Sequence, residues 1–252
     1  MIVNAGRSLA ADSVTPTIIG GGEATEEYPF MTAIDRLRDT GVSSFTCGGT
    51  LIDPEWVLTA AHCVSDRDTG AVYDAALFAV RVGSLDRTAG GETAGVEEIV
   101  IHPDWFGDVE RNVGDLALMR LDTAVGAGTL PVAGAEAEVG SGVRFVGWGY
   151  TVNGGPELPT GLRQLESTVV PGEQCVVGGE WDIAEGDICT SPEVESGLCG
   201  GDSGSPVLQW VNDRWELVGT VSRGVGSGCA DEPDVLVSVP YHEEWIAGVV
   251  NS

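Results

Sequence analysis

Short apolar runs recur along nearly the whole chain, and their length is the feature that most restricts the fold. Most runs span four to seven residues, are rich in Val, Leu and Ile, and are separated by Gly, Pro, Asp or Asn. Representative runs are FMTAI, WVLTAA, LFAVRV, LALMRL, VRFVGWG and VLVSV. Segments this short are typical of β-strands joined by tight turns, whereas helices are usually longer. The pattern therefore predicts an all-β sandwich or barrel.

Three stretches depart from the strand pattern. Residues 1–17 are small and polar, and we expect them to form an N-terminal tail. The stretch 122–142 has few large apolar residues and is interpreted as a connection between two β units. The last stretch, 239–252, spaces four apolar side chains like one face of a helix: Trp245, Ile246, Val249 and Val250. The chain shows no internal repeat.

The charge of the chain is strongly acidic. It carries 39 Asp and Glu residues against 12 basic residues, all of them Arg, for a net charge of −27. Phosphate groups would be repelled, which excludes nucleic acid as a partner. The preferred explanation of this charge is a highly soluble surface. Tolerance of high salt and attraction of basic substrates are the alternatives, and composition does not separate them. No apolar stretch is long enough to span a membrane.

The six cysteines point to disulfide bonds. An even number in a chain of this size indicates an oxidising compartment and hence secretion. No CxxC pair occurs and there are only three histidines, so we expect no metal site. The N-terminus lacks a charged start followed by an apolar run and is a poor signal peptide. Either a leader has been removed or the export route is not visible in the sequence.

Ser203 is the candidate nucleophile, within GLCGGDSGSP at 197–206. A serine hydroxyl is a weak nucleophile at neutral pH and needs an adjacent base, most often histidine. His62, in WVLTAAHCV, would by itself be interpreted as a core or capping residue. His102 precedes a proline and His242 lies in the terminal helix, so we expect both at the surface or in packing contacts.

The order of three motifs changes that interpretation. WVLTAAHC, GDLALMRL and GDSGSP follow one another along the chain, which here resembles the chymotrypsin-like serine endopeptidases. IIGG, CGGTLI, GWG and SRG extend the resemblance over residues 18–252. The resemblance implies two antiparallel six-stranded β-barrels and a C-terminal helix. It places the first barrel at 18–125, with 18–28 packing on the second, the second barrel at 126–238, and the helix at 239–252.

The resemblance also implies a role for each residue of these motifs. His62 would be the general base, Asp115 the carboxylate that orients it, and Ser203 the nucleophile. The backbone N–H groups of Gly201 and Ser203 would form the oxyanion hole. An esterase on another fold is disfavoured, because α/β-hydrolases follow the order Ser, Asp, His and their GxSxG motif needs a glycine where Ser205 stands.

Activation and cross-linking follow from the same resemblance. Cleavage of the Thr17–Ile18 bond would free an amine that pairs with buried Asp202. A trypsin-like activator needs Arg or Lys before that bond, and the only basic residue upstream is Arg7, so a separate processing enzyme or removal of a leader is expected. The implied disulfides are Cys47–Cys63, Cys175–Cys189 and Cys199–Cys229.

The expected substrate pocket departs from the common family patterns. Gly197 stands where trypsin-like members carry the aspartate that binds Arg or Lys. Asp234 replaces a glycine of the opposite wall, and we expect it to favour basic residues or broad specificity, unless it points to solvent. Arg223 replaces a tryptophan between Ser222 and Gly224. Its charge would either favour acidic residues upstream of the cut or pair with a nearby carboxylate.

These inferences together predict a secreted serine endopeptidase of bacterial type, a monomer acting through an acyl-enzyme. Its expected partners are protein or peptide substrates and proteinaceous inhibitors. No cofactor is expected, because the stretch 84–98 does not match the calcium loop of some relatives. The alternative is a catalytically silent homologue that acts as a binding module, although such proteins usually lose a member of the triad.

Overall fold

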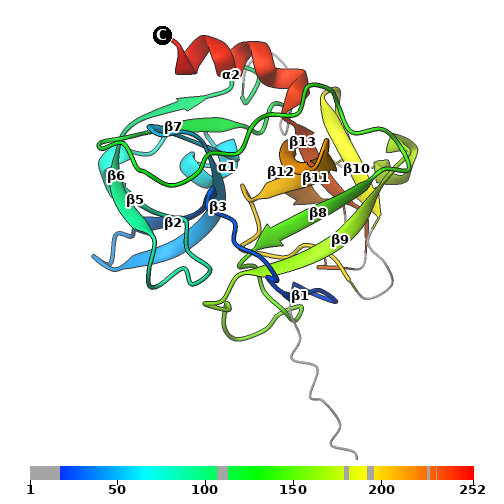
Figure 1. The fold of residues 1–252 in the computed structure, drawn as a ribbon, viewed down its shortest axis with the longest axis horizontal. Helices are drawn as coiled ribbons and strands as arrows, with labels where there is room; N and C mark the ends of the chain where they lie inside the picture. Colours follow the sequence, from blue (N-terminus) through cyan, green and yellow to red (C-terminus); the bar gives the residue numbers. More distant parts are fainter. Residues whose placement is uncertain (1–17, 107–112, 179–181, 192–195, 226–227, 231) are drawn as a thin grey trace, which may run out of the picture.

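The computed structural model describes residues 18–106, 113–178, 182–191, 196–225, 228–230 and 232–252. Two β-barrels lie beside each other, with the chain passing from the first to the second (Figure 1). Each barrel is closed, antiparallel and six-stranded, which confirms the predicted fold class. The predicted tail 1–17, and with it the bond before Ile18, lies outside the described residues.

The first barrel closes in the order β2-β3-β4-β7-β6-β5. Its interior holds the apolar side chains that alternate along strands such as β5, where Phe78, Val80 and Val82 are buried and Ala79 is exposed. That alternation gives each strand one face for the core. The strands are β2 (Met31–Leu37), β3 (Ser43–Asp53), β4 (Trp56–Thr59), β5 (Phe78–Val82), β6 (Glu92–Ile101) and β7 (Ala117–Leu121).

The second barrel closes in the order β8-β9-β10-β13-β12-β11, with β11 pairing back to β8. The short strand β1 (Gly22–Glu23) adds to its edge by pairing with β9. The segment next to Ile18 is thereby attached to the second barrel rather than to the first. The strands are β8 (Gly142–Gly147), β9 (Arg163–Val170), β10 (Asp187–Ser191), β11 (Pro206–Val211), β12 (Arg214–Gly224) and β13 (Asp234–Ser238).

Helices are short and few within the described part of the chain. α1 (Ala61–Val64) follows β4, and α2 (Glu243–Val250) ends the fold after a 3-10 turn, η3 (Pro240–His242). Two further 3-10 turns are η1 (Ala75–Leu77) and η2 (Gly172–Cys175). The α-helix therefore begins later than residue 239, because Pro240 opens a tighter turn first. No helix among the described residues is long and apolar enough to cross a bilayer.

His102 and His242, the two histidines that lie outside the WVLTAAHC motif, are both buried and pack on each other. The Nδ1 atom of His242 lies 3.1 Å from Nε2 of His102, and Trp245 stacks edge-on against His102. Burial lowers the pKa of both rings, that of His242 to about 4. They join α2 to the loop after β6, so packing is their role, and the surface alternative is wrong for both.

Candidate active site

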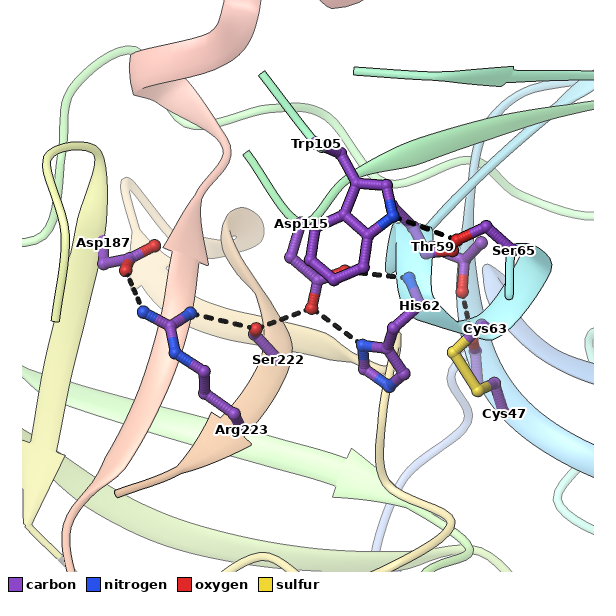
Figure 2. A network of polar contacts seen from close by, with 12 residues as sticks. Cys47, Thr59, His62, Cys63, Ser65, Trp105, Asp115, Asp187, Ser222 and Arg223 are labelled. Carbon is purple, nitrogen blue, oxygen red and sulfur yellow. Dashed lines mark hydrogen bonds and ion pairs between the residues drawn. A yellow bond between two sulfur atoms is a disulfide. The ribbon is translucent and has the colours of Figure 1, made fainter. Parts of the chain in front are cut away.

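His62 and Asp115 lie next to the ends of two neighbouring strands of the first barrel. His62 lies in α1, directly after β4, and Asp115 lies just before β7, which pairs with β4. The His62 Nδ1 and Asp115 Oδ2 atoms are 2.7 Å apart, and the backbone N–H of His62 donates to Oδ1 at 2.9 Å (Figure 2). The Ser222 hydroxyl donates to Oδ2 at 2.6 Å. Three donors therefore surround one buried carboxylate.

The charge state of Asp115 follows from those contacts. Burial disfavours the ionised form, but the charge and hydrogen bonds of His62 and the hydroxyl of Ser222 outweigh it and hold the pKa of Asp115 below its usual range. The carboxylate is therefore ionised at neutral pH. An ionised Asp115 keeps the ring proton of His62 on Nδ1, which leaves Nε2 as the basic atom.

Ser203 stands on a tight turn between the two barrels. The turn is closed by the N–H of Ser205, which donates to the carbonyl of Asp202 at 3.0 Å, and by Gly204, whose φ is 77°. A Cβ on Gly204 would lie 2.2 Å from Thr59 Oγ1, so this position requires glycine. The N–H of Gly48, in the first barrel, donates to the carbonyl of Ser203 at 2.9 Å. The turn is thus held directly against β3.

The Cys47–Cys63 disulfide brings the nucleophile and base segments together. Cys47 precedes Gly48, which contacts Ser203, and Cys63 follows His62. Nε2 of His62 is buried and accepts no hydrogen bond from the described residues, so no bond to the Ser203 hydroxyl is formed in this structure. Such bonds are often loose before substrate binds. The structure shows the three expected disulfide pairs: Cys47–Cys63, Cys175–Cys189 and Cys199–Cys229.

The backbone at Gly201 has a conformation that favours glycine. Its φ is 99°, and a Cβ there would lie 2.8 Å from Leu158 Cδ2. Neither the N–H of Gly201 nor that of Ser203 donates a hydrogen bond within the described residues. Both donors are therefore available to an oxyanion that forms beside Ser203.

Asp202 is completely buried beside the nucleophile. Its carboxylate accepts the N–H groups of Gly149, at 2.8 Å, and Cys199, at 3.0 Å. Burial raises its pKa to about 7, and among the described residues no cation forms an ion pair with it. Ile18 is also fully buried, and the carbonyl of Ile19 accepts the N–H of Gly197 at 2.9 Å. The segment that begins at Ile18 is therefore packed into the protein beside Gly197.

Asp234 is buried as well, and it does not point to solvent. Only 4% of the residue is exposed, and its Oδ2 atom lies 3.4 Å from the N–H of Leu198, next to Gly197. Its pair across the β12–β13 ladder is Gly224. Burial raises the pKa of Asp234 to about 7, and the charge of Asp202 adds to the rise. Asp234 therefore lies beside Gly224 and next to Gly197, and among the described residues no cation forms an ion pair with it.

Arg223 forms a buried ion pair with Asp187, a partner that the sequence pattern does not identify. Its guanidinium lies 2.5 Å from Asp187 Oδ2 in β10, donates to the carbonyl of Asp182 at 2.8 Å, and donates to Ser222 Oγ at 3.1 Å (Figure 2). Of the two expectations for Arg223, the carboxylate pair is the one present. Asp187 was missed because the residues are 36 positions apart. The one available signal was an arginine at a normally apolar position.

The candidate metal ligands of the site cannot act as such. Among the described residues, Cys47, His62 and Cys63 form the one group whose ligand atoms lie within 4.8 Å of one another. Both sulfur atoms are bonded to each other in the disulfide, so neither is a thiolate that could bind an ion.

Two six-stranded barrels with the histidine and carboxylate on one and the serine turn on the other define a chymotrypsin-like serine protease domain. The family profile described as Trypsin matches residues 18–246, and the chain belongs to this family. Phenoloxidase-activating factor 1 of Holotrichia diomphalia is 30% identical over 267 residues, covering 96% of this chain and 71% of that protein. Because this relative is an insect protein, the comparison gives no support to the expected bacterial type.

Proposed function

We propose that the chain is a secreted serine endopeptidase that hydrolyses peptide bonds through His62, Asp115 and Ser203. The observation that carries the proposal is the bond between His62 Nδ1 and the ionised Asp115. That bond fixes one tautomer of the imidazole and leaves Nε2 to take the proton of Ser203 as its oxygen attacks the carbonyl. His62 then returns the proton to the leaving amine, and water hydrolyses the acyl-enzyme by the same route.

The oxyanion of each tetrahedral intermediate would bind the N–H groups of Gly201 and Ser203. These donors need no rearrangement, because the turn around them is already closed by its own backbone bonds. A donor that is prepared for the developing charge typically contributes about 10²–10³ in rate.

We further propose that the first barrel spans residues 18–125 and the second barrel residues 126–238, with the substrate cleft between them.

The primary pocket would have Gly197 at its base and Asp234 on its wall. A buried carboxylate without a cation is unfavourable, and a bound Arg or Lys side chain would supply the cation. The proposal is supported by the burial of Asp234 and by its contact with Leu198, the neighbour of Gly197. We infer a preference for cleavage after basic residues, with large apolar residues accepted because Gly197 leaves the base open.

Activation would use the other buried acid. After cleavage before Ile18, the new ammonium group would form an ion pair with Asp202, whose pKa burial raises to about 7. The chain that starts at Met1 is then a weakly active precursor. Because residue 17 is Thr, its activator has a specificity other than Arg or Lys.

The setting of the enzyme is inferred from its covalent structure and its relative. Three disulfides indicate an oxidising, extracellular location. The relative is named for activating phenoloxidase, and we infer that this chain cuts a protein substrate and is controlled by proteinaceous inhibitors. It would act as a monomer without a cofactor.

Active-site labelling tests the proposed function. The chain trimmed to begin at Ile18 should react with a phosphonylating reagent at Ser203 and should cleave a diverse peptide library. Ser203→Ala should abolish the labelling and lower kcat by about 10⁶-fold. An intact, folded protein that is neither labelled nor active would instead support the silent homologue that acts as a binding module.

A further inference from the structure

The Arg223–Asp187 ion pair lies inside the protein, directly beyond the residues that surround Asp115. The two side chains are 5% and 1% exposed. Asp187 also accepts the N–H of Ala184 at 2.9 Å, and Arg223 also donates to the carbonyl of Asp182. Both groups are therefore held from more than one direction, and Arg223 is not part of an exposed substrate surface.

The pair is connected to the catalytic carboxylate through one hydroxyl group. Arg223 Nη1 lies 3.1 Å from Ser222 Oγ, and the same oxygen lies 2.6 Å from Asp115 Oδ2 (Figure 2). A guanidinium can only donate, so Ser222 accepts from Arg223 with a lone pair. The single hydroxyl proton is then directed to Asp115. Donation from a cation also polarises the hydroxyl and strengthens its bond to the carboxylate.

We propose that Arg223 and Asp187 are positioning residues that hold the Ser222 hydroxyl in its donor orientation toward Asp115 and so tune the His62–Asp115 pair. The inference rests on the proposed function, since it assigns these two residues to the same reaction. It extends the hydrogen-bonded chain from His62 and Asp115 across the second barrel to β10. Without Arg223, Ser222 would be free to turn its proton away from the carboxylate.

The sign of the electrostatic effect follows from the charged groups along this series of hydrogen bonds. They include Asp187 on β10, Asp115 before β7, His62 on α1 and the Arg223 guanidinium, which also donates to the carbonyl of Asp182. A positive Arg223 disfavours protonation of His62, and a negative Asp187 favours it. Removing one charge at a time should therefore move the pKa of His62 in opposite directions.

The test is an NMR titration of the His62 ring in the full chain carrying Ser203→Ala, which prevents self-digestion. Arg223→Met should move the His62 ring resonances at a given pH toward those of the protonated ring, and Asp187→Asn should move them in the opposite direction. The double variant should return toward the parent value. Because the titration needs no turnover, it decides the inference even if the proposed peptidase activity is absent.

Matched controls separate this role from a structural one. Arg120→Met removes an arginine whose ion pair with Glu97 is about half exposed, and it should leave the His62 titration unchanged. In the processed enzyme, Arg223→Met should move the acid limb of kcat/KM upward without changing KM for peptides with acidic residues upstream. Shifts of the same sign for Arg223→Met and Asp187→Asn, or no shift in folded variants, would overturn the proposal. If Arg223→Met does not fold, Asp187→Asn and the double variant still give the sign.

Discussion

At the scale of single residues, the site contains buried carboxyl groups that differ in the partners that stabilise their negative charge. Asp115 has its partners, and its pKa is held low. Asp187 has Arg223, yet burial still raises its pKa to about 6. Within the described residues, Asp202 and Asp234 accept hydrogen bonds from backbone N–H groups alone, and burial raises the pKa of each to about 7. An added cation should therefore lower the pKa of Asp202 and Asp234 more than that of Asp115 or Asp187.

Asp234→Gly should remove cleavage after Arg and Lys. Truncating one partner of a buried charge pair costs about 2–5 kcal/mol, so kcat/KM for basic peptides should fall by about 30-fold to 4,000-fold. Cleavage after Phe, Tyr or Leu should persist, because Gly197 is unchanged.

In the wild type, the ratio of Arg to Phe cleavage should rise with pH through about 7, as Asp234 ionises. Library profiling measures both; equal losses for basic and apolar peptides would contradict the assigned pocket.

At the scale of elements, the apolar runs predicted strands more reliably than strand lengths. FMTAI and LFAVRV fall in β2 and β5 as expected. β6 (Glu92–Ile101) is longer than its apolar run, because its first half carries Thr, Ala and Gly and is held by ladder bonds to β5. Such pairing depends on a strand distant in sequence, so periodicity alone does not show it.

Gly48→Ala should disturb the contact between β3 and the nucleophile turn. A Cβ on Gly48 would lie 2.0 Å from Ser205 Oγ, so the turn must move away from the first barrel. A displacement of about 1 Å can reduce the rate by about 10²-fold, while overpacking costs about 1–3 kcal/mol of stability. Gly142→Ala, at a site with open space, is the matched control and should change neither kcat nor Tm. An unchanged kcat in Gly48→Ala would show that the turn tolerates the shift.

At the scale of the whole molecule, Asp202 couples the cleavage state of the N-terminus to stability. Its folded pKa of about 7 exceeds the ordinary value of 3.8, so the folded precursor binds this proton more tightly than the unfolded chain. Asp202 therefore contributes stability that is fully present below about pH 4, declines as the pH rises, and is lost above about pH 7. An ammonium group at Ile18 would remove that decline.

The Tm of the precursor should therefore fall more steeply between about pH 4 and 7 than that of the chain beginning at Ile18. Both proteins should carry Ser203→Ala, so that self-digestion does not interfere. Asp202→Asn should flatten the pH dependence of the precursor and remove the difference between the two forms. Parallel Tm curves for a precursor and a trimmed chain that both keep Asp202 would show that the new amine does not reach this acid.

The sequence by itself determined the strand-rich class, the disulfide chemistry and, through three ordered motifs, the residues proposed for catalysis. These features are local, since apolar spacing and short motifs depend on neighbours along the chain. Only the tertiary structure decided that His102 packs on His242, that Asp234 turns inward to Leu198, and that Arg223 pairs with Asp187. Each of these joins residues from separate elements. The physical reason is burial. A charged or polar group removed from water needs a hydrogen-bond partner, and the closed barrels determine which groups lie close enough to supply one.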